Sequence, residues 1–140
     1  VKLGRKLIVG FKRDTFSGLI ANTYGVAPRE TWGTWSVSDR VKVEFLRELP
    51  SSFELTITAK AFGPNVGKPF SVIVGNSTKT LMVTSEMHSY EMKFHNHGGS
   101  RKIEFTVPKP TSPKELGLNN DAREIGLGLV ELRIEPFFGR

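Results

Sequence analysis

The chain has 140 residues, 38% of them hydrophobic and 24% charged, which suffices for the core of one domain but not of two. It has no cysteine and no apolar run of 18 residues, which excludes disulfides, thiolate chemistry and an apolar membrane-spanning helix. Because 20 basic residues outnumber 14 acidic ones, the net charge is +6, compatible with nucleic acid, anionic lipid or acidic glycans as partners.

The first thirteen residues form the only local cluster of basic side chains, interleaved with Leu, Ile, Val and Phe. This pattern favours an exposed strand edge, where Lys discourages aggregation, over a polyanion site. Elsewhere the basic residues are scattered and do not gather around the aromatic ones, so we do not expect nucleic-acid binding. Because the chain has no long apolar run, we do not expect it to insert directly into a membrane. Since the chain begins with Val1 and not Met, we expect it to be part of a longer protein.

Hydrophobic and polar residues alternate along most of the chain, and this period of two predicts strands. We expect strands at residues 6–11 and 41–45 and a longer one at 53–62. In the longest strand, one set of side chains faces the core and the other faces solvent, the solvent set being Glu54, Thr56, Thr58 and Lys60.

Two hairpins follow in chain order. Residues 70–74 and 79–83 are joined by Gly75-Asn76-Ser77, a composition that supplies the positive φ of a tight turn. Residues 90–94 and 103–107 both alternate and are joined by a glycine-rich tip at 96–100, which predicts a second hairpin.

The C-terminal third contains the one expected helix and the last strand. Ser112-Pro113-Lys114-Glu115 has the spacing of a capping box, and Gly117 would end the helix within a turn or two. The final segment, 125–134, changes phase by one residue, which predicts a β-bulge eased by Gly126 and Gly128. The fold class is therefore all-β: a single antiparallel β-sandwich or jelly roll of about eight strands with one short helix in a loop.

Catalytic motifs are missing from the sequence. There is no nucleophile elbow, and residues 63–68 lack the spacing of a phosphate-binding loop, with Pro64 removing an amide. His95 and His97 have a spacing that would allow a metal, but exposed loop histidines are the favoured interpretation because no carboxylate ligand lies near in sequence. We expect no cofactor, no metal and no catalytic residue in this chain.

Both tryptophans lie three residues apart in the segment 29–40, among charged and hydroxyl residues. Flat aromatic faces beside hydrogen-bonding groups are what a sugar-binding surface requires. The alternative is that Trp32 or Trp35 plugs the end of the sandwich, since Trp is highly buried on average. The candidate ligand-binding residues in this segment are Arg29, Trp32, Trp35 and Asp39.

Two further polar segments supply candidates. Asn65 and Lys68 lie in a loop, where binding residues concentrate on a rigid sandwich. Asp121 and Arg123 are two residues apart, and we expect them to form a pair that orders their loop; the functional alternative is a rim site for sugar hydroxyls or a phosphate.

Four segments together resemble the non-catalytic C-terminal domain of bacterial phosphoglycerol transferases. They are residues 32–36, 59–69, 112–118 and 121–129, and the likeness covers roughly residues 14–135. The resemblance implies a β-sandwich on the periplasmic face of an inner-membrane enzyme that decorates periplasmic glucans, with the catalytic residues and metal ligands upstream of this chain. It implies the catalytic domain and an envelope glycan as partners.

Two hypotheses remain. In the first, the domain is an accessory glucan-binding domain of a phosphoglycerol transferase. In the second, it is a structural or interaction domain that packs on the catalytic domain or another partner without binding sugar, and its surface then carries an apolar patch.

Overall fold

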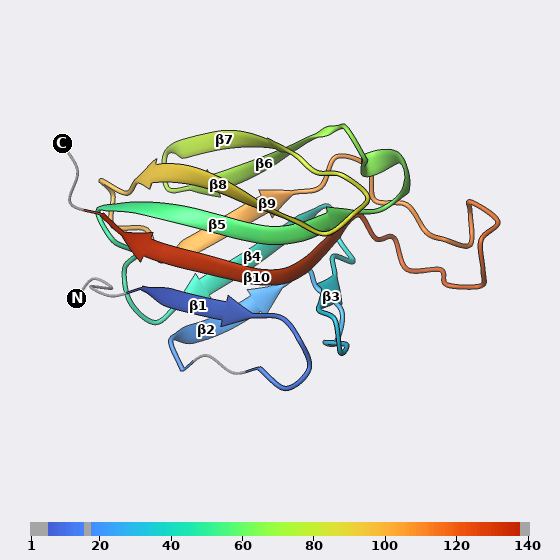
Figure 1. Ribbon diagram of the computed structural model, residues 1–140, viewed down its shortest axis with the longest axis horizontal. Helices are drawn as coiled ribbons and strands as arrows, with labels where there is room; N and C mark the ends of the chain where they lie inside the picture. Colours follow the sequence, from blue (N-terminus) through green and yellow to red (C-terminus); the bar gives the residue numbers. More distant parts are fainter. Residues whose placement is uncertain (1–5, 16–17, 138–140) are drawn as a thin grey trace.

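The computed structural model describes residues 6–15 and 18–137, which form two antiparallel sheets packed face to face (Figure 1). The first sheet has the strand order β1-β10-β5-β8, with β3 also paired to β10, and the second has the order β2-β4-β9-β6-β7. The strands are β1 (Leu7–Gly10), β2 (Ile20–Tyr24), β3 (Thr34–Trp35), β4 (Arg40–Phe45), β5 (Ser52–Ala61), β6 (Pro69–Val74), β7 (Ser77–Met82), β8 (His88–His95), β9 (Lys102–Thr106) and β10 (Leu127–Pro136). The expected all-β sandwich is confirmed, with ten strands in the described residues instead of about eight.

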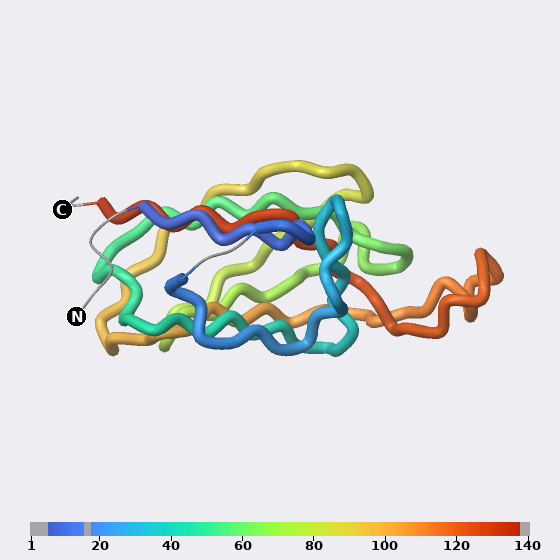
Figure 2. Tube along the Cα trace, turned by 90° about the horizontal axis from the view of Figure 1, so that it is seen from below, coloured from blue at the N-terminus to red at the C-terminus, as the bar shows by residue number. Residues whose placement is uncertain are grey.

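The core lies between the two sheets, whose two layers are visible in the edge-on view of the chain trace (Figure 2). In β5, Phe53, Leu55 and Ile57 are fully buried, and the residues between them face outward, which confirms the predicted alternation. Alternating residues of β4 and β9 meet them from the second sheet. Burial of these aliphatic and aromatic side chains is the main force that holds the sheets together.

The last strand, β10, holds the first sheet together because it pairs with β1, β3 and β5. Its register against β5 shifts between Leu129 and Glu131, which confirms the predicted bulge. Gly126 and Gly128 precede the bulge, and both lie where a Cβ would crowd neighbouring side chains. Their small size therefore leaves room for close packing.

The first predicted hairpin is confirmed, since β6 pairs with β7 along its whole length. Val74 pairs with Ser77, so the turn has two residues, Gly75 and Asn76. Gly75 has φ +56°, a conformation that glycine adopts without steric cost.

The second predicted hairpin is wrong: β8 pairs with β5 in the first sheet, whereas β9 pairs with β4 and β6 in the second. The glycine-rich segment between them crosses from one sheet to the other. Buried Asn96 holds this crossing, because its Nδ2 donates to the carbonyls of Leu49 and Ser100 and its Oδ1 accepts from the Ser100 amide.

The predicted helix at residue 112 is also wrong. The capping-box pair forms, with the Ser112 amide donating to Glu115 Oε1 at 2.8 Å and the Glu115 amide to Ser112 Oγ at 3.1 Å, but the segment continues as turns. Gly117, at φ +74°, bends the chain before a helix can propagate. Residues 112–124, here called the protruding loop, extend beyond the sandwich (Figures 1 and 2). Among the described residues the one helix is a 3-10 turn, η1 (Gly63–Asn65).

Candidate functional site

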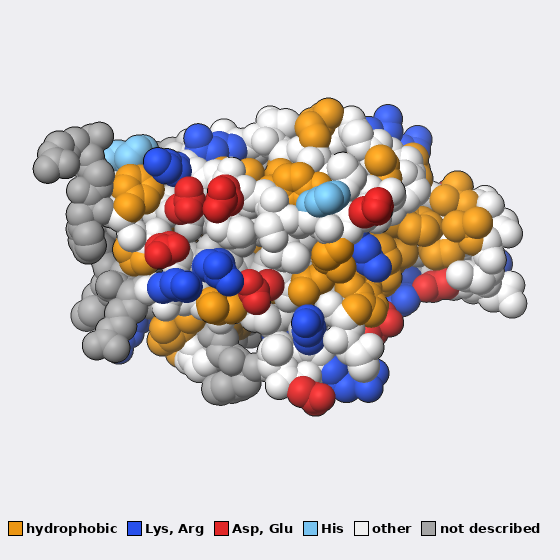
Figure 3. Space-filling model, viewed as in Figure 1, with side chains coloured by type: hydrophobic (Ala, Val, Ile, Leu, Met, Phe, Trp, Pro, Cys, Tyr) orange, Lys and Arg blue, Asp and Glu red, His pale blue; other side chains and the backbone are white. Residues whose placement is uncertain are grey.

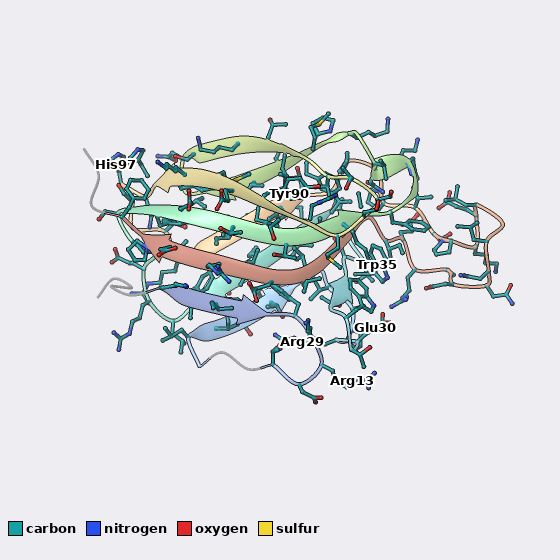
Figure 4. All side chains as sticks on the ribbon, viewed as in Figure 1. Arg13, Arg29, Glu30, Trp35, Tyr90 and His97 are labelled. Atoms are coloured by element: carbon teal, nitrogen blue, oxygen red, sulfur yellow. The ribbon has the colours of Figure 1, made fainter. Side chains whose placement is uncertain are left out.

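The two tryptophans lie on the outside of the first sheet and are each partly exposed. Their rings meet edge to face, with centroids 5.0 Å apart and planes at 64°, and Trp35 meets Phe62 in the same way at 5.9 Å. Figure 4 shows Trp35 beside the end of β5 where β10 begins. Neither indole plugs the sandwich, because both remain in contact with solvent.

The loop that carries the tryptophans is fixed against β10 by hydrogen bonds. The Leu127 amide donates to buried Ser36 Oγ at 2.9 Å, and Thr34 Oγ1 donates to the Ala27 carbonyl at 2.6 Å. Gly33 has φ +153°, and a Cβ there would overlap the carbonyl oxygen of Leu129. The backbone therefore runs close to β10, which sets the position of both indoles.

Lys60, on the solvent side of β5, completes this surface. Its Nζ lies 4.0 Å from the ring centroid of Trp32 and 5.0 Å from that of Trp35, so one ammonium makes cation–π contacts with both. A Cβ at Gly128 would lie 3.0 Å from Lys60 Cγ and Trp35 Cζ3. Gly128 thus makes space for the group, which we call the tryptophan platform (Trp32, Trp35 and Lys60).

Charged residues flank the platform on the side of the protruding loop. Trp32 Nε1 donates to Glu30 Oε1 at 3.3 Å. Arg123 forms a forked pair with Asp121, with Nη2 to Oδ2 at 2.7 Å and Nε to Oδ1 at 3.0 Å. The side-chain hydrogen bond from Arg123 lowers the pKa of Asp121. The hydrogen bond to Asp121 raises the pKa of Arg123, and the charges of Asp121 and Glu30 add to that effect. The predicted loop-ordering pair is therefore confirmed.

The other predicted residues do not join the platform. Arg29 donates from Nη1 to the Thr15 carbonyl at 2.8 Å and stacks over Phe11, so it fastens the loop to the sandwich. Asp39 is exposed before β4, where it accepts from Ser38 Oγ, and Lys68 is exposed in the turn before β6.

Asn65 is fully buried, although the sequence suggested a side chain presented to a ligand. Its Nδ2 donates to the carbonyls of Phe62 and Lys109, both at 2.8 Å, and its Oδ1 accepts from the Lys109 amide at 2.8 Å. All of its strong hydrogen-bonding groups are used inside the protein. Asn65 therefore joins two loops and leaves no group free for a ligand.

His95 and His97 stack on each other with centroids 5.8 Å apart, and His95 Nδ1 lies 2.9 Å from Ser52 Oγ. Over residues 6–15 and 18–137, no three His, Cys, Asp or Glu side chains come together in a way that could hold a metal ion. Within the same residues, no helix has the length and apolarity needed to cross a membrane.

Sequence reasoning missed Lys60 and Glu30 as members of this surface. The alternation along residues 53–62 did place Lys60 on the solvent face, which was the available signal. Its position beside the tryptophans depends on the pairing of Lys60 with Gly128 and of Gly128 with Trp35. Chemically, the platform offers two aromatic surfaces, one cation and a flanking carboxylate to a polar ligand with apolar faces.

Similar sequences occur in bacterial transferases. The chain is 37% identical over 137 residues to phosphoglycerol transferase I of Salmonella arizonae and 36% identical to that of Salmonella typhi. Each alignment covers 90% of this chain but 18% of the transferase, so the chain spans about a fifth of the length of these relatives.

Solved structures with a similar fold are carbohydrate-binding modules. BiXyn10A CBM1 has a TM-score of 0.57 at 9% identity and covers 94% of this chain and 97% of its own. A variant of the family 29 module CBM29-2 has a TM-score of 0.56 at 12% identity, covering 94% and 88%. The CBM36-1 domain of a xylanase from the hindgut metagenome of Trinervitermes trinervoides has a TM-score of 0.52 at 19% identity, covering 96% and 99%. At such low identity these likenesses establish the β-sandwich fold.

The model of one protein family matches residues 9–136, nearly the whole chain, and that family is described as a domain of unknown function. The chain therefore belongs to the DUF7024 family.

Proposed function

We propose that this domain binds glycan chains on the tryptophan platform and serves as the accessory glucan-binding domain of a phosphoglycerol transferase. The observation that carries the proposal is the pair of partly exposed indoles, 5.0 Å apart, fixed on the outer face of a rigid sheet. The C–H face of a pyranose ring packs on an indole, while its hydroxyls take hydrogen bonds from Lys60 and give them to Glu30.

Rigid placement of the platform favours weak but specific sugar binding. Thr34 and Ser36 hold the loop through buried hydrogen bonds, so little conformational entropy is lost when a ligand binds. An open surface desolvates few atoms, and we therefore expect dissociation constants of roughly 0.1–1 mM.

The relatives support the proposed role of the domain within a phosphoglycerol transferase. Because the similar proteins are phosphoglycerol transferases about five times longer than this chain, the domain would sit beside a catalytic domain elsewhere in the parent protein. Holding a glucan acceptor near that domain raises its effective concentration at the active site. We place this activity at the periplasmic face of the bacterial inner membrane, and assign no catalytic residue to the domain itself.

A heteronuclear NMR titration with β-linked gluco-oligosaccharides tests the proposal by following the two indole N–H signals. We expect saturable shifts of both signals, and in Trp35→Ala we expect the remaining Trp32 signal no longer to shift. The matched control is Tyr24→Ala: Tyr24 is 48% exposed and contacts Lys42 by a cation–π interaction, as the tryptophans contact Lys60, but it lies on the second sheet. Absence of shifts at millimolar oligosaccharide would contradict the proposal.

A second candidate function is docking without sugar, and one feature favours it. Leu116 and Leu118 in the protruding loop are 45% and 65% exposed. Apolar side chains on an ordered surface loop suit contact with another protein or domain. If the domain docks only, a Leu116→Ser and Leu118→Ser double variant weakens its association with the rest of the parent enzyme, while no indole signal responds to glucan.

A further inference from the structure

A second aromatic cluster lies at the other end of the same sheet face. Phe137 follows β10, and its amide donates to the Ser52 carbonyl at 3.1 Å. Its ring meets His95 edge to face at 6.2 Å, and Lys93 Nζ lies 5.3 Å from its centroid. These residues border an open hollow of about 500 Å³ lined by Glu54, Lys93, Glu135, Pro136 and Phe137.

This cluster repeats the composition of the tryptophan platform. Each has a partly exposed aromatic ring, a lysine over that ring and a carboxylate nearby: Glu30 at the platform, and Glu54 and Glu135 at the hollow. Both lie on the outer face of the first sheet. Figure 3 shows a group of charged side chains over the left-hand half of this face and a larger hydrophobic area over its right-hand half.

The strand register connects the two clusters. Lys60 and Gly128 pair at one end, and Glu54 pairs with both Glu135 and Lys93 at the other. The six-residue separation between Lys60 and Glu54 along β5 corresponds to about 20 Å. A single sugar cannot bridge this distance, but an extended oligosaccharide can.

Hydrogen-bonding groups line the interval between the clusters. The outward residues of β5 there are Thr56 and Thr58, and Thr58 Oγ1 lies 2.9 Å from Ser89 Oγ on β8. On β10, Glu131 pairs with Thr58 and Arg133 pairs with Thr56. Arg133 Nη2 lies 3.5 Å from Glu131 Oε2. Hydroxyl, carboxylate and guanidinium groups thus follow one line between two aromatic surfaces.

We propose that the outer face of the first sheet is one continuous binding track for a linear glycan, with the hollow at Phe137 as a second sugar subsite. This inference rests on the proposed function, because it takes the tryptophan platform as the first subsite. A chain that reaches both ends is held by both aromatic contacts, whereas a disaccharide occupies one. Affinity therefore increases with chain length until the ligand spans the track.

Calorimetric titration with β-linked gluco-oligosaccharides, from the disaccharide to the heptasaccharide, tests the inference. We expect Phe137→Ala to weaken binding of the longest ligand about tenfold, because one of the two terminal aromatic contacts is lost, and to leave disaccharide binding unchanged. Trp35→Ala weakens binding of every length. Lys93→Ala serves as a second variant at the far end, in case Phe137→Ala alters the fold as judged by its amide spectrum.

The outcomes separate the two proposals. If long oligosaccharides shift amide signals only around Trp32 and Trp35, and Phe137→Ala binds all lengths as the parent chain does, the track is refuted and the platform stands. If no ligand of any length binds, the proposed function itself fails. If the heptasaccharide shifts signals along β5 and at both ends, the track is supported.

Discussion

Two polar loops lie at the same end of the sandwich and differ in how their side chains are used. The loop around Asn65 turns its amide inward, where both N–H donors and the oxygen form hydrogen bonds within the protein. The loop around Trp32 and Trp35 turns its hydroxyls inward and leaves the indoles partly exposed. A polar loop whose donors and acceptors are already paired is structural. A loop with partly exposed indoles on a rigid backbone can bind a ligand.

The largest expected effect comes from Asn65→Ala. The substitution leaves the buried Lys109 amide without its acceptor and removes one of the two donors to each of the carbonyls of Phe62 and Lys109. We expect a loss of about 3 kcal/mol in the free energy of unfolding. Urea denaturation measures the loss, and oligosaccharide affinity per folded molecule should be unchanged. If Asn65→Ala is as stable as the parent chain but no longer binds sugar, the Asn65 loop has a binding role and not a structural one.

Trp35→Ala should affect glucan affinity strongly and stability less than Asn65→Ala does. We expect at least a tenfold loss of glucan affinity, because one of the two indoles of the platform is removed. The cost in stability should be about 2 kcal/mol, less than for a fully buried Trp, because the indole is partly exposed. Calorimetry and urea denaturation on the same preparation separate the two effects, with Tyr24→Ala as the control.

Gly128→Ala tests whether the platform depends on its packing against β10. The added Cβ would lie 3.0 Å from Lys60 Cγ and Trp35 Cζ3 and 3.1 Å from Trp32 Cη2, so these side chains must move by a few tenths of an ångström. We expect a cost of about 1 kcal/mol and displaced indole N–H signals. Unmoved indole signals would mean that the platform is not packed on Gly128.

Lys60→Gln removes the cation but keeps a side chain of similar length. Losing the two cation–π contacts should cost about 0.5–1 kcal/mol at this partly exposed position. The measurement is the free energy of unfolding together with the indole emission spectrum. An unchanged spectrum would show that the ammonium does not rest over the rings in solution.

The smallest effect concerns pH and the protruding loop. Because hydrogen bonds from Arg123 lower the pKa of Asp121, the pair orders the loop fully above the ordinary carboxyl pKa of 3.8. That contribution is lost as the pH falls through the lower pKa of the folded state. The protection of the Arg123 amide from exchange, relative to an unstructured peptide at the same pH, should fall in that range, because its N–H donates to Asp121 Oδ1. In Asp121→Asn the protection should be low on both sides of that range.

Much of the fold follows from local sequence, and what does not depends on long-range pairing. Alternation in residues 53–62 specifies both the strand and its buried face, because one face of the sheet meets the core. The segment between β8 and β9 carries the same glycine-rich signal whether it turns back or crosses to the other sheet. The partner strands of β8 and β9 decide between a hairpin and a crossing, and a local pattern does not identify those partners. The short strands β2 and β3 were missed for a different reason, because their residues do not alternate between hydrophobic and polar.

The pairing of Asp121 with Arg123 was predicted from their spacing and is confirmed. Trp32 and Trp35 were proposed as ligand-binding residues; the structure shows that their rings meet, and ligand binding by them stays a prediction. Asn65 could not be assigned, because a polar residue in a glycine-rich loop gives no signal of burial. Lys60 joins the platform through pairing across β5, β10 and β3, segments that are distant in sequence.

The position of β10 at the centre of the first sheet bears on how the protein is made. As the ribosome adds residues, β1, β3 and β5 emerge long before the strand that joins them. Until residue 136 is free, those strands present unpaired edges that can pair with other chains. A nascent domain of this topology therefore folds late and slowly, and any truncation that removes β10 should yield aggregates in place of a smaller folded sandwich.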